Sequence, residues 1–540
     1  MSVSRRQTTS RVIALGGSGL LLALALPVTA AGAAPGRGCD ERTNNTYAKL
    51  LDCVTPDGVM EHQRAFQAIA DASTDPVYPD SRAAGTQGYA ASVDHVSGLL
   101  EEAGYDVTTA PVEFRFDFPA VLDRTGTSPA TYESSVFTNS GAGDVTGTVV
   151  PIDLALEPPR ASTSGCEASD FAGAALGGSS DIALVQRGTC TFAVKVQNAV
   201  AAGAEAVVVL NSGTEASTEG LVVGTLDPYV ASVPVVGASF ADGRALAAEG
   251  STARVAVQEP ETRTDVSVVA ELAGEDTSNV VMAGAHLDSV PAGPGINDNG
   301  SGSSALLETA LMMANSKPQN TIRFGWWGAE ELGLLGSAAY VESLPQAERD
   351  RIALYMNYDM VASPNHVQMV YDSDQSTWPA PVPIPAGSTA IEDVYESYYT
   401  AVGVPYDDAE YSGRSDYEAF IEAGIPSGGL FTGAEVVKTE EQAAIWGGVA
   451  GESFDPCYHL ACDTIDNLAE DALDVNSDLI AFAMLTFASS TEPVNGVPGR
   501  EVPGRPFELP APAGPEGTFE VPPGGGGLEH DHEHAHDTVA

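Results

Sequence analysis

The sequence predicts an α/β fold in which a mixed, mostly parallel sheet is flanked by helices and interrupted by an inserted β-rich unit. Three observations support this prediction. Between residues 264 and 490, short apolar runs alternate with stretches of helical apolar spacing, as they do in βαβ units. Residues 34–118 contain helical patterns that lead into one strand. Residues 119–263 instead contain short β-type runs between Gly, Ser and Ala loops, so we expect a separate inserted domain there.

The length and charge of the chain limit its classes of function. At 540 residues it has room for more than one domain and a large core. It contains 24 Lys and Arg against 74 Asp and Glu, which gives a formal charge of −50. Nucleic acid and anionic membrane surfaces both favour clustered cations, so neither is expected as a partner. We expect a monomer whose partners are its substrates.

Residues 1–33 have the pattern of an export signal. Three arginines precede an apolar run over residues 12–26, and small residues that suit cleavage follow directly. The alternative is a membrane anchor, but the apolar run is short for a membrane span. Paired arginines leave both Sec and twin-arginine export open. We therefore expect a secreted, extracellular protein.

The cysteines also fit an exported protein. Six cysteines occur as three separated pairs along the chain, and an even number in an exported protein favours disulfides. The simplest connectivity joins neighbours in the sequence: Cys39–Cys53, Cys166–Cys190 and Cys457–Cys462.

The first segment, 34–118, has helical apolar spacing over 62–72 and 88–103, followed by a strand over 105–116. Within 119–263, β-type runs are expected at 147–152, 182–186, 206–210 and 233–237, with a helix over 192–202. No histidine occurs between His95 and His286, so we expect no chemistry in this insert. The sequence favours a lid or access-control role for it, against a role in binding proteins.

The main segment, 264–490, has strands at 266–272, 280–285, 321–327 and 352–358 and helices at 301–315, 332–343, 415–422 and 479–489. After residue 490 the chain is rich in Pro, Gly and Glu and ends with a histidine-rich motif. This composition is typical of disorder, so residues 491–540 are predicted to form a disordered tail. Its histidines could bind metal, but a flexible tail is a poor place for catalysis: His530, His532, His534 and His536.

Polar side chains follow the predicted strands at the points where these strands end. The first strand ends on His286, and the loop after it contributes Asp298. The next ends before Glu330 and Glu331, and the third ends before Asp359. Because the carboxyl ends of parallel strands meet at one sheet edge, we expect these side chains to converge there.

A second histidine, His459, lies far along the chain. Two histidines and three carboxylates suit zinc, and five protein ligands exceed what one catalytic zinc takes. We therefore expect two zinc ions bridged by Asp298. His286 and Asp359 would hold one ion, and Glu331 and His459 the other.

Glu330 remains beside the ligands as a candidate general base, which would take a proton from the attacking water and pass it to the leaving amine. Asp288 could accept a hydrogen bond from the second ring nitrogen of His286 and so fix its tautomer.

Five motifs resemble those of secreted di-zinc aminopeptidases of the bacterial leucyl aminopeptidase type: AGAHLDSV, INDNGSG, WWGAEELGLLGS, NYDMV and CYHLACDT. They occur in the order found in that family, and the resemblance covers most of 40–118 and 263–490. The intervening region resembles a protease-associated domain, most clearly in VQRGTCTFAVKVQNAVAAGA. The resemblance implies a zinc-exopeptidase fold and hydrolysis of amino-terminal residues from peptides, most of all large apolar residues such as leucine.

By position, the resemblance implies the same five zinc ligands and the same base. It adds Tyr458 as the group that stabilises the oxyanion, with Arg414, Phe431 and Met360 near the substrate. It also implies the Cys457–Cys462 disulfide. Asp474 and Asp478 match a calcium-site pair of some secreted members, although the amino-terminal ligand of that site is not evident here, so calcium remains a second metal to consider.

Three other functions fit the sequence less well. A carboxypeptidase on the same scaffold would need a cationic site for the free carboxylate of its substrate, which this cation-poor chain supports weakly. A non-catalytic, receptor-like relative would have lost ligands or base, whereas all are present here. A single-zinc cyclase would lack part of the second ligand set, which is complete.

Overall fold

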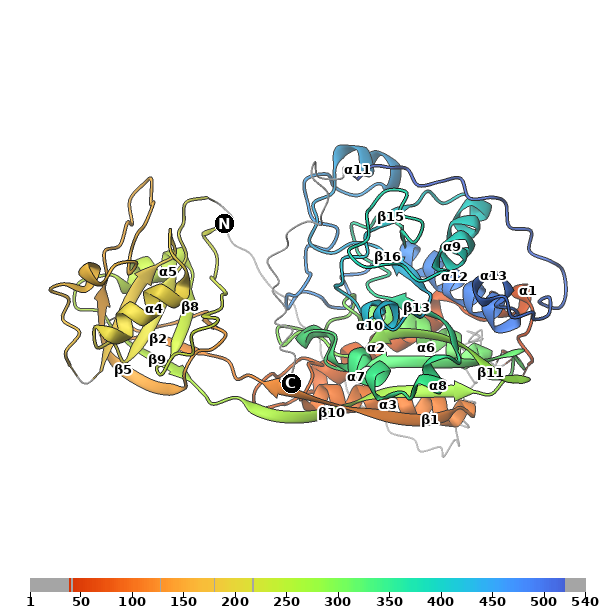
Figure 1. Cartoon of the computed structure of the whole chain (residues 1–540), viewed down its shortest axis with the longest axis horizontal. Coiled ribbons are helices and arrows are strands. Elements are labelled where there is room, and N and C mark those ends of the chain that lie inside the picture. The colour runs from red at the N-terminus through yellow and green to blue at the C-terminus, as the bar shows by residue number, and fades with distance from the viewer. Residues whose placement is uncertain (1–37, 40–41, 127, 179, 216–217, 520–540) are drawn as a thin grey trace, which may run out of the picture.

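The computed structural model describes residues 38–39, 42–126, 128–178, 180–215 and 218–519. The predicted export signal and the four tail histidines lie outside these residues. Two sheets organise the chain, and the long strands β1 (Asp106–Phe116) and β10 (Glu261–Leu272) lead from one to the other (Figure 1).

The first sheet is mixed, in the order β1-β10-β12-β11-β13-β16-β14-β15. Its central strands β12, β11, β13 and β16 run parallel, whereas β10 pairs antiparallel with both β1 and β12. The remaining strands of this sheet are β11 (Asp276–His286), β12 (Asn320–Trp327), β13 (Ile352–Tyr358), β14 (Met369–Tyr371), β15 (Asp407–Ala409) and β16 (Ser427–Phe431). The predicted mixed α/β fold is confirmed.

Both faces of this sheet are buried, because successive residues of its strands alternate between two apolar cores. In β11, Val281 and Ala283 pack in one core and Met282 in the other. This explains why the central strands are continuous apolar runs in the sequence. One core holds helices α2 (Pro56–Ala72), α3 (Gln87–Ala103), α6 (Gly300–Met313), α9 (Ser388–Val402) and α12 (Glu470–Ser489), and the other holds α7 (Leu335–Ser343) and α10 (Tyr417–Glu422).

Several shorter elements complete this part of the chain: α1 (Tyr47–Leu50), the 3-10 turn η3 (Glu330–Leu332), α8 (Gln346–Arg349), α11 (Glu440–Trp446) and α13 (Glu492–Asn495). Three predicted helices differ in their start by three residues or more, and the first of them, expected from 62, begins at Pro56. The helix expected from 332 begins at Leu335, because 330–332 form η3, and the helix expected from 479 begins at Glu470. Among the described helices, α12 is long and apolar enough to span a membrane, but it is mostly buried in the core.

The second sheet belongs to the insert and has the order β3-β2-β9-β5-β6-β7-β8-β4. Its parallel strands β5 to β8 carry an apolar core on each face. Pairing of Phe116 with Glu261 places 261–263 in the first sheet instead of the insert. The elements are β2 (Val121–Thr125), β3 (Ala130–Tyr132), β4 (Ser135–Val136), β5 (Gly143–Pro151), η1 (Ala168–Phe171), β6 (Asp181–Gln186), α4 (Phe192–Ala201), β7 (Ala206–Leu210), β8 (Val235–Ala238), α5 (Phe240–Leu246) and β9 (Thr252–Val257).

The prediction that everything after residue 490 is disordered is wrong for residues 491–519, which pack on the domain built around the first sheet (the first domain). The Phe507 ring stacks on Tyr398 and contacts Phe482. Near the end of this segment, the Gly517 and Thr518 main-chain N–H groups donate to the Asp407 carboxylate. A few apolar anchors and backbone hydrogen bonds therefore order a segment whose average composition is typical of disorder.

Three disulfides stabilise the structure, and all three join the pairs that the sequence order suggested. They are Cys39–Cys53, Cys166–Cys190 and Cys457–Cys462. The last closes the loop that carries His459.

Candidate metal centre and active site

The carboxyl ends of three neighbouring parallel strands build the site. His286 is the last residue of β11, which lies between β12 and β13. Glu330 and Glu331 follow β12, and Asp359 follows β13. The strand order therefore brings together the residues that the sequence placed at the ends of strands.

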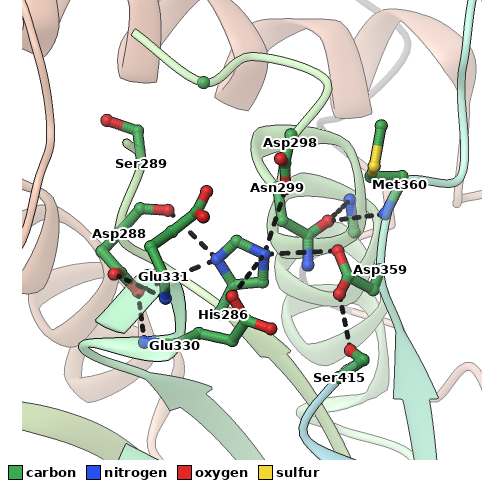
Figure 2. Close-up of polar contacts among 12 residues, drawn as sticks. His286, Asp288, Ser289, Asp298, Asn299, Glu330, Glu331, Asp359, Met360 and Ser415 are labelled. Carbon is green, nitrogen blue, oxygen red and sulfur yellow. Dashed lines mark hydrogen bonds and ion pairs between the residues drawn. The ribbon is translucent and has the colours of Figure 1, made fainter. Parts of the chain in front are cut away.

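Two groups of potential ligands meet at Asp298. In the first group, His286 Nε2 lies 3.2 Å from Asp298 Oδ1 and 3.2 Å from Asp359 Oδ1 (Figure 2). In the second, His459 Nε2 lies 3.3 Å from Asp298 Oδ2 and 3.1 Å from Glu331 Oε2. Each oxygen of Asp298 thus serves a different group, which is the arrangement of a bridging carboxylate.

The spacing of these atoms fits metal coordination. Ligand atoms about 2.1 Å from a tetrahedral ion are roughly 3.4 Å apart, close to the separations seen here. Glu331 Oε1 is buried and has no hydrogen-bond partner among the described residues. Buried polar atoms are normally satisfied, so this oxygen fits a site that holds a cation.

The charges in the site lead to the same conclusion. Burial opposes protonation of His286, but the nearby carboxylates, above all Glu330 and Asp359, outweigh it and raise its pKa well above the usual range. Burial likewise opposes a charge on His459, yet Glu331 and Asp298 raise its pKa to about 11. The carboxylates thus favour positive charge at both positions, which a metal cation would supply.

Asp288 holds the site through a different atom from the one expected. His286 Nδ1 contacts the main-chain oxygen of Asp288 at 3.1 Å, while the Asp288 carboxylate is 3.7 Å away. The predicted hydrogen bond to the carboxylate is therefore corrected to one with the carbonyl oxygen. The carboxylate instead accepts the main-chain N–H groups of Glu330 and Glu331 (Figure 2). When His286 Nδ1 carries the hydrogen and donates it to this carbonyl oxygen, Nε2 has a lone pair with which to bind metal.

Other groups that position the ligands were not identified from the sequence. Asp463 accepts the main-chain N–H groups of Asn297 and Asp298, and so fixes the bridging loop. Ser415 donates to Asp359 Oδ2 at 2.5 Å. Asp463 lies within the CYHLACDT motif, which was the available signal, but an acidic side chain alone is not informative in a chain this acidic.

Strained backbone conformations accompany the ligands. Ala329, Met360 and His459 have positive φ angles of 57°, 52° and 57°, which side chains other than glycine rarely adopt. Ala329 immediately precedes Glu330, and Met360 immediately follows Asp359. His459 is itself one of the potential ligands. Such conformations persist only where the surrounding structure holds them, and they often occur at functional sites.

Glu330 and Tyr458 border the two ligand groups. Glu330 Oε2 lies 3.8 Å from His286 Nε2, and burial raises the pKa of Glu330 well above its usual range. Burial and the carboxylates of Asp298 and Glu331 raise the pKa of Tyr458, so its phenol keeps its proton. Arg414 donates to the Tyr458 oxygen at 3.1 Å and to Glu435 at 2.7 Å. Because the Tyr458 oxygen accepts a hydrogen bond from Arg414, its own hydroxyl hydrogen can be donated to another acceptor.

A cavity of about 360 Å³ opens beside these residues. The three residues expected near the substrate, Arg414, Phe431 and Met360, all line it. Much of the remaining wall is apolar and includes Phe519 from the carboxyl-terminal segment, which the sequence did not predict. The lining residues described here all come from the first domain, so they give the predicted lid role of the insert no support.

The calcium-site pair, Asp474 and Asp478, lies on α12. Burial, and then Asp474, raises the pKa of Asp478 to about 7. Within the described residues, neither aspartate belongs to a group of three or more potential ligands whose atoms lie within 4.8 Å of one another.

Arg82 holds the loop between His286 and Asp298 in place through hydrogen bonds to its main chain. Its fully buried guanidinium donates to the main-chain oxygens of Leu287, Pro294 and Gly295. Burial lowers the pKa of Arg82 to about 10, so it remains charged at neutral pH.

Replacing Arg82 by Met should lower the free energy of unfolding by about 2–4 kcal/mol, because three buried carbonyls lose their donor. Denaturant unfolding would measure this loss. The exposed Arg64, also contributed by the first segment, provides the matched control: Arg64→Met should change stability by less than about 0.5 kcal/mol. Equal effects of the two substitutions would contradict this role.

Comparison with known proteins places this site in a family. The model of peptidase family M28 matches residues 267–484, and the PA domain model matches residues 145–246. An aminopeptidase of Pseudomonas aeruginosa is 43% identical over 461 residues, which cover 84% of each chain. A probable leucine aminopeptidase 2 of Aspergillus fumigatus is 40% identical over 427 residues, covering 77% of this chain and 81% of that protein.

Solved structures agree with the sequence relatives. An aminopeptidase from Aneurinibacillus sp. strain AM-1 is 28% identical, with a TM-score of 0.53, and the match covers 85% of this chain and 99% of that one. A zinc aminopeptidase from Bacillus subtilis is 25% identical, with a TM-score of 0.57, over 83% and 98% of the two chains. The family expected from the motifs is confirmed: the chain belongs to peptidase family M28 and contains an inserted PA domain.

Proposed function

We propose that this protein is an exported metalloaminopeptidase that uses two zinc ions to remove amino-terminal residues from peptides. The observation that carries the proposal is Asp298, whose two oxygens face two separate ligand groups. Aminopeptidases recur among the relatives, and the Bacillus subtilis structure is that of a zinc enzyme.

His286, Asp298 and Asp359 would hold one zinc ion, and Asp298, Glu331 and His459 the other. When bound, such a pair of ions makes a water molecule acidic and polarises the carbonyl group of the scissile bond. Asp288, Ser415 and Asp463 would hold the ligands in place through the hydrogen bonds described above.

Glu330 is the proposed general base. It is buried, lies beside the ligands and forms part of the cavity wall. Its carboxylate would accept a proton from the attacking water and later pass it to the amine of the leaving peptide. A raised pKa suits this second step, because a carboxylate that holds its proton longer can act as an acid.

Tyr458 would donate a hydrogen bond to the oxyanion that forms during attack. Replacing Tyr458 by Phe should lower kcat by roughly 10- to 100-fold and leave bound zinc unchanged, because the ring stacked on His459 is kept while the donor is lost. Steady-state kinetics with zinc analysis would measure this. An unchanged kcat would exclude Tyr458 as the donor.

The cavity favours an amino terminus over a free carboxylate. Arg414 is the one Lys or Arg among the described lining residues, and Glu435 already pairs with it. Several carboxylates, including Glu330 and Glu410, line the same space and suit an ammonium group. The apolar wall around Phe431 and Met360 suits a large apolar first side chain. These features disfavour the carboxypeptidase alternative.

The experiment compares leucyl p-nitroanilide with its amino-acetylated form, before and after chelation and with zinc added back. Release from the free substrate that chelation abolishes and zinc restores, with the acetylated substrate inert, is expected. Cleavage of amino-blocked peptides from their carboxyl end would instead support a carboxypeptidase.

Location and domain limits complete the proposal. We propose export to the extracellular side or cell envelope, which the three disulfides support. We also propose that 34–118 and 264–490 form a peptidase domain interrupted by the insert 119–263, with the end of the insert moved to residue 260 because Glu261 pairs with Phe116 in the first sheet.

A further inference from the structure

Five acidic side chains gather at the wall of the cavity and belong to none of the ligand groups that contain His286 or His459. Asp372 and Asp374 follow β14, Glu392 and Glu396 lie on α9, and Asp408 lies in β15. They form two overlapping groups of three whose carboxylate oxygens lie within 4.8 Å of one another, with Glu392 common to both. We call these five residues the acidic cluster.

Burial raises the free-energy cost of keeping the carboxylates of the acidic cluster ionised. Asp372, Glu392, Glu396 and Asp408 are only 1%, 3%, 8% and 1% exposed. The charges that act most strongly on Glu392, Glu396 and Asp408 come from other carboxylates. Like charges this close and this buried cannot all remain ionised without a compensating cation.

One buried oxygen of the cluster also lacks a donor. Asp408 Oδ2 accepts hydrogen bonds from the Ser376 and Thr377 hydroxyls, at 3.0 and 2.5 Å. Asp408 Oδ1 is buried and has no hydrogen-bond partner among the described residues. Since buried carboxylate oxygens are normally satisfied, this atom is independent evidence for a ligand that binds here.

We propose that the acidic cluster binds one Ca²⁺ ion. The donors are all carboxylate oxygens, which Ca²⁺ accepts in flexible geometry with six to eight ligands, whereas zinc in proteins favours nitrogen and sulfur. Asp374 is exposed, so an ion can reach the cluster from solvent. Extracellular calcium sites with many carboxylates bind at concentrations that occur outside cells.

Bound Ca²⁺ would stabilise the wall of the substrate cavity. The Trp378 main-chain N–H donates to Asp372 at 2.6 Å, and its indole N–H donates to the Asp408 main-chain oxygen at 3.4 Å. Trp378 and Asp408 both line the cavity. An ion that holds Asp372 and Asp408 therefore fixes the tryptophan between them.

The test measures thermal unfolding of the zinc-loaded full chain, dialysed free of calcium and then titrated with Ca²⁺ or Mg²⁺. At a hundredfold excess over its dissociation constant, Ca²⁺ should raise the Tm by roughly 3 °C or more, and Mg²⁺ by much less. Glu392→Gln and Asp408→Asn should each abolish this increase. Asp478→Asn is the matched control and should retain it, because it tests the calcium-site pair on α12.

If either variant fails to fold, Tb³⁺ bound to the wild-type protein provides the second measurement. Its emission excited through tryptophan should fall strongly in Trp378→Phe, because Trp378 adjoins the cluster. Emission that does not depend on Trp378 would overturn the proposal.

Two results of the titration would overturn it as well. The first is a Ca²⁺ effect that survives in Glu392→Gln and disappears in Asp478→Asn. The second is no Ca²⁺ effect, which means that protons alone neutralise the cluster. Burial and neighbouring acids raise the pKa values of Glu392, Glu396 and Asp408 to about 9, 7 and 6. The folded state would then bind more protons than the unfolded state, and stability would fall as pH rises from about 4 to 9.

Discussion

Replacing Glu330 by Gln is expected to lower kcat for leucyl p-nitroanilide by roughly 10²- to 10⁴-fold. The glutamine amide would keep the size of the side chain but could not accept a proton. Glu330 lies outside the two groups that share Asp298, although it forms a further group with His286 and Glu331, and we expect bound zinc to remain unchanged. KM should change little, because the amide still fills the same position in the wall.

Kinetics and zinc analysis on the same preparation separate this effect from loss of metal. Glu342→Gln, an exposed position on the nearby helix α7, is the matched control and should retain full activity. Nearly normal kcat for Glu330→Gln would remove Glu330 from the reaction. A loss of zinc in that variant would instead make it a ligand.

Asp298→Asn is the second substitution with a large expected effect. The two Asp298 oxygens lie next to different histidines, at 3.2 and 3.3 Å, so the carboxylate charge serves both ligand groups. The amide has no negative charge and offers one acceptor oxygen in place of two. We expect bound zinc to fall from two equivalents to one or fewer, and activity to fall by at least about 10³-fold.

Zinc analysis after equilibrium dialysis measures this outcome directly. Asp350→Asn, on the surface after α8, controls for the loss of one carboxylate in an acidic protein. Retention of two tightly bound zinc ions by Asp298→Asn would contradict a bridging role. Thermal unfolding without zinc should show that the variant still folds, since its main-chain N–H group remains available to Asp463.

The central strands, and the strand ends that carry the site, could be predicted from the sequence because these strands lie in the middle of a parallel sheet. Strands buried on both faces are continuous apolar runs, and parallel strands deliver their last residues to one edge. His286, Glu331 and Asp359 could therefore be predicted from the sequence to lie together. Asp298 and His459 lie in loops, where strand order does not help. Their assignment to the two zinc ions was predicted from the chemistry of a metal pair bridged by one carboxylate.

The parts that were missed depend on long-range contacts. Strands β14 and β15 are three residues each, too short for a periodic pattern. Asp463 works through two main-chain N–H groups, which no sequence pattern reveals. The carboxyl-terminal segment is held by a few aromatic anchors such as Phe507, and its average composition hides them. Asp288 was expected to act through its carboxylate, but its main-chain oxygen contacts the imidazole.

The most direct test of the two-metal proposal is a zinc titration of the metal-free protein, with bound zinc and leucyl p-nitroanilide hydrolysis followed in the same samples. Two equivalents should bind, and activity should reach its maximum only as the second site fills. Full activity at one equivalent, with the second equivalent bound elsewhere or absent, would contradict it.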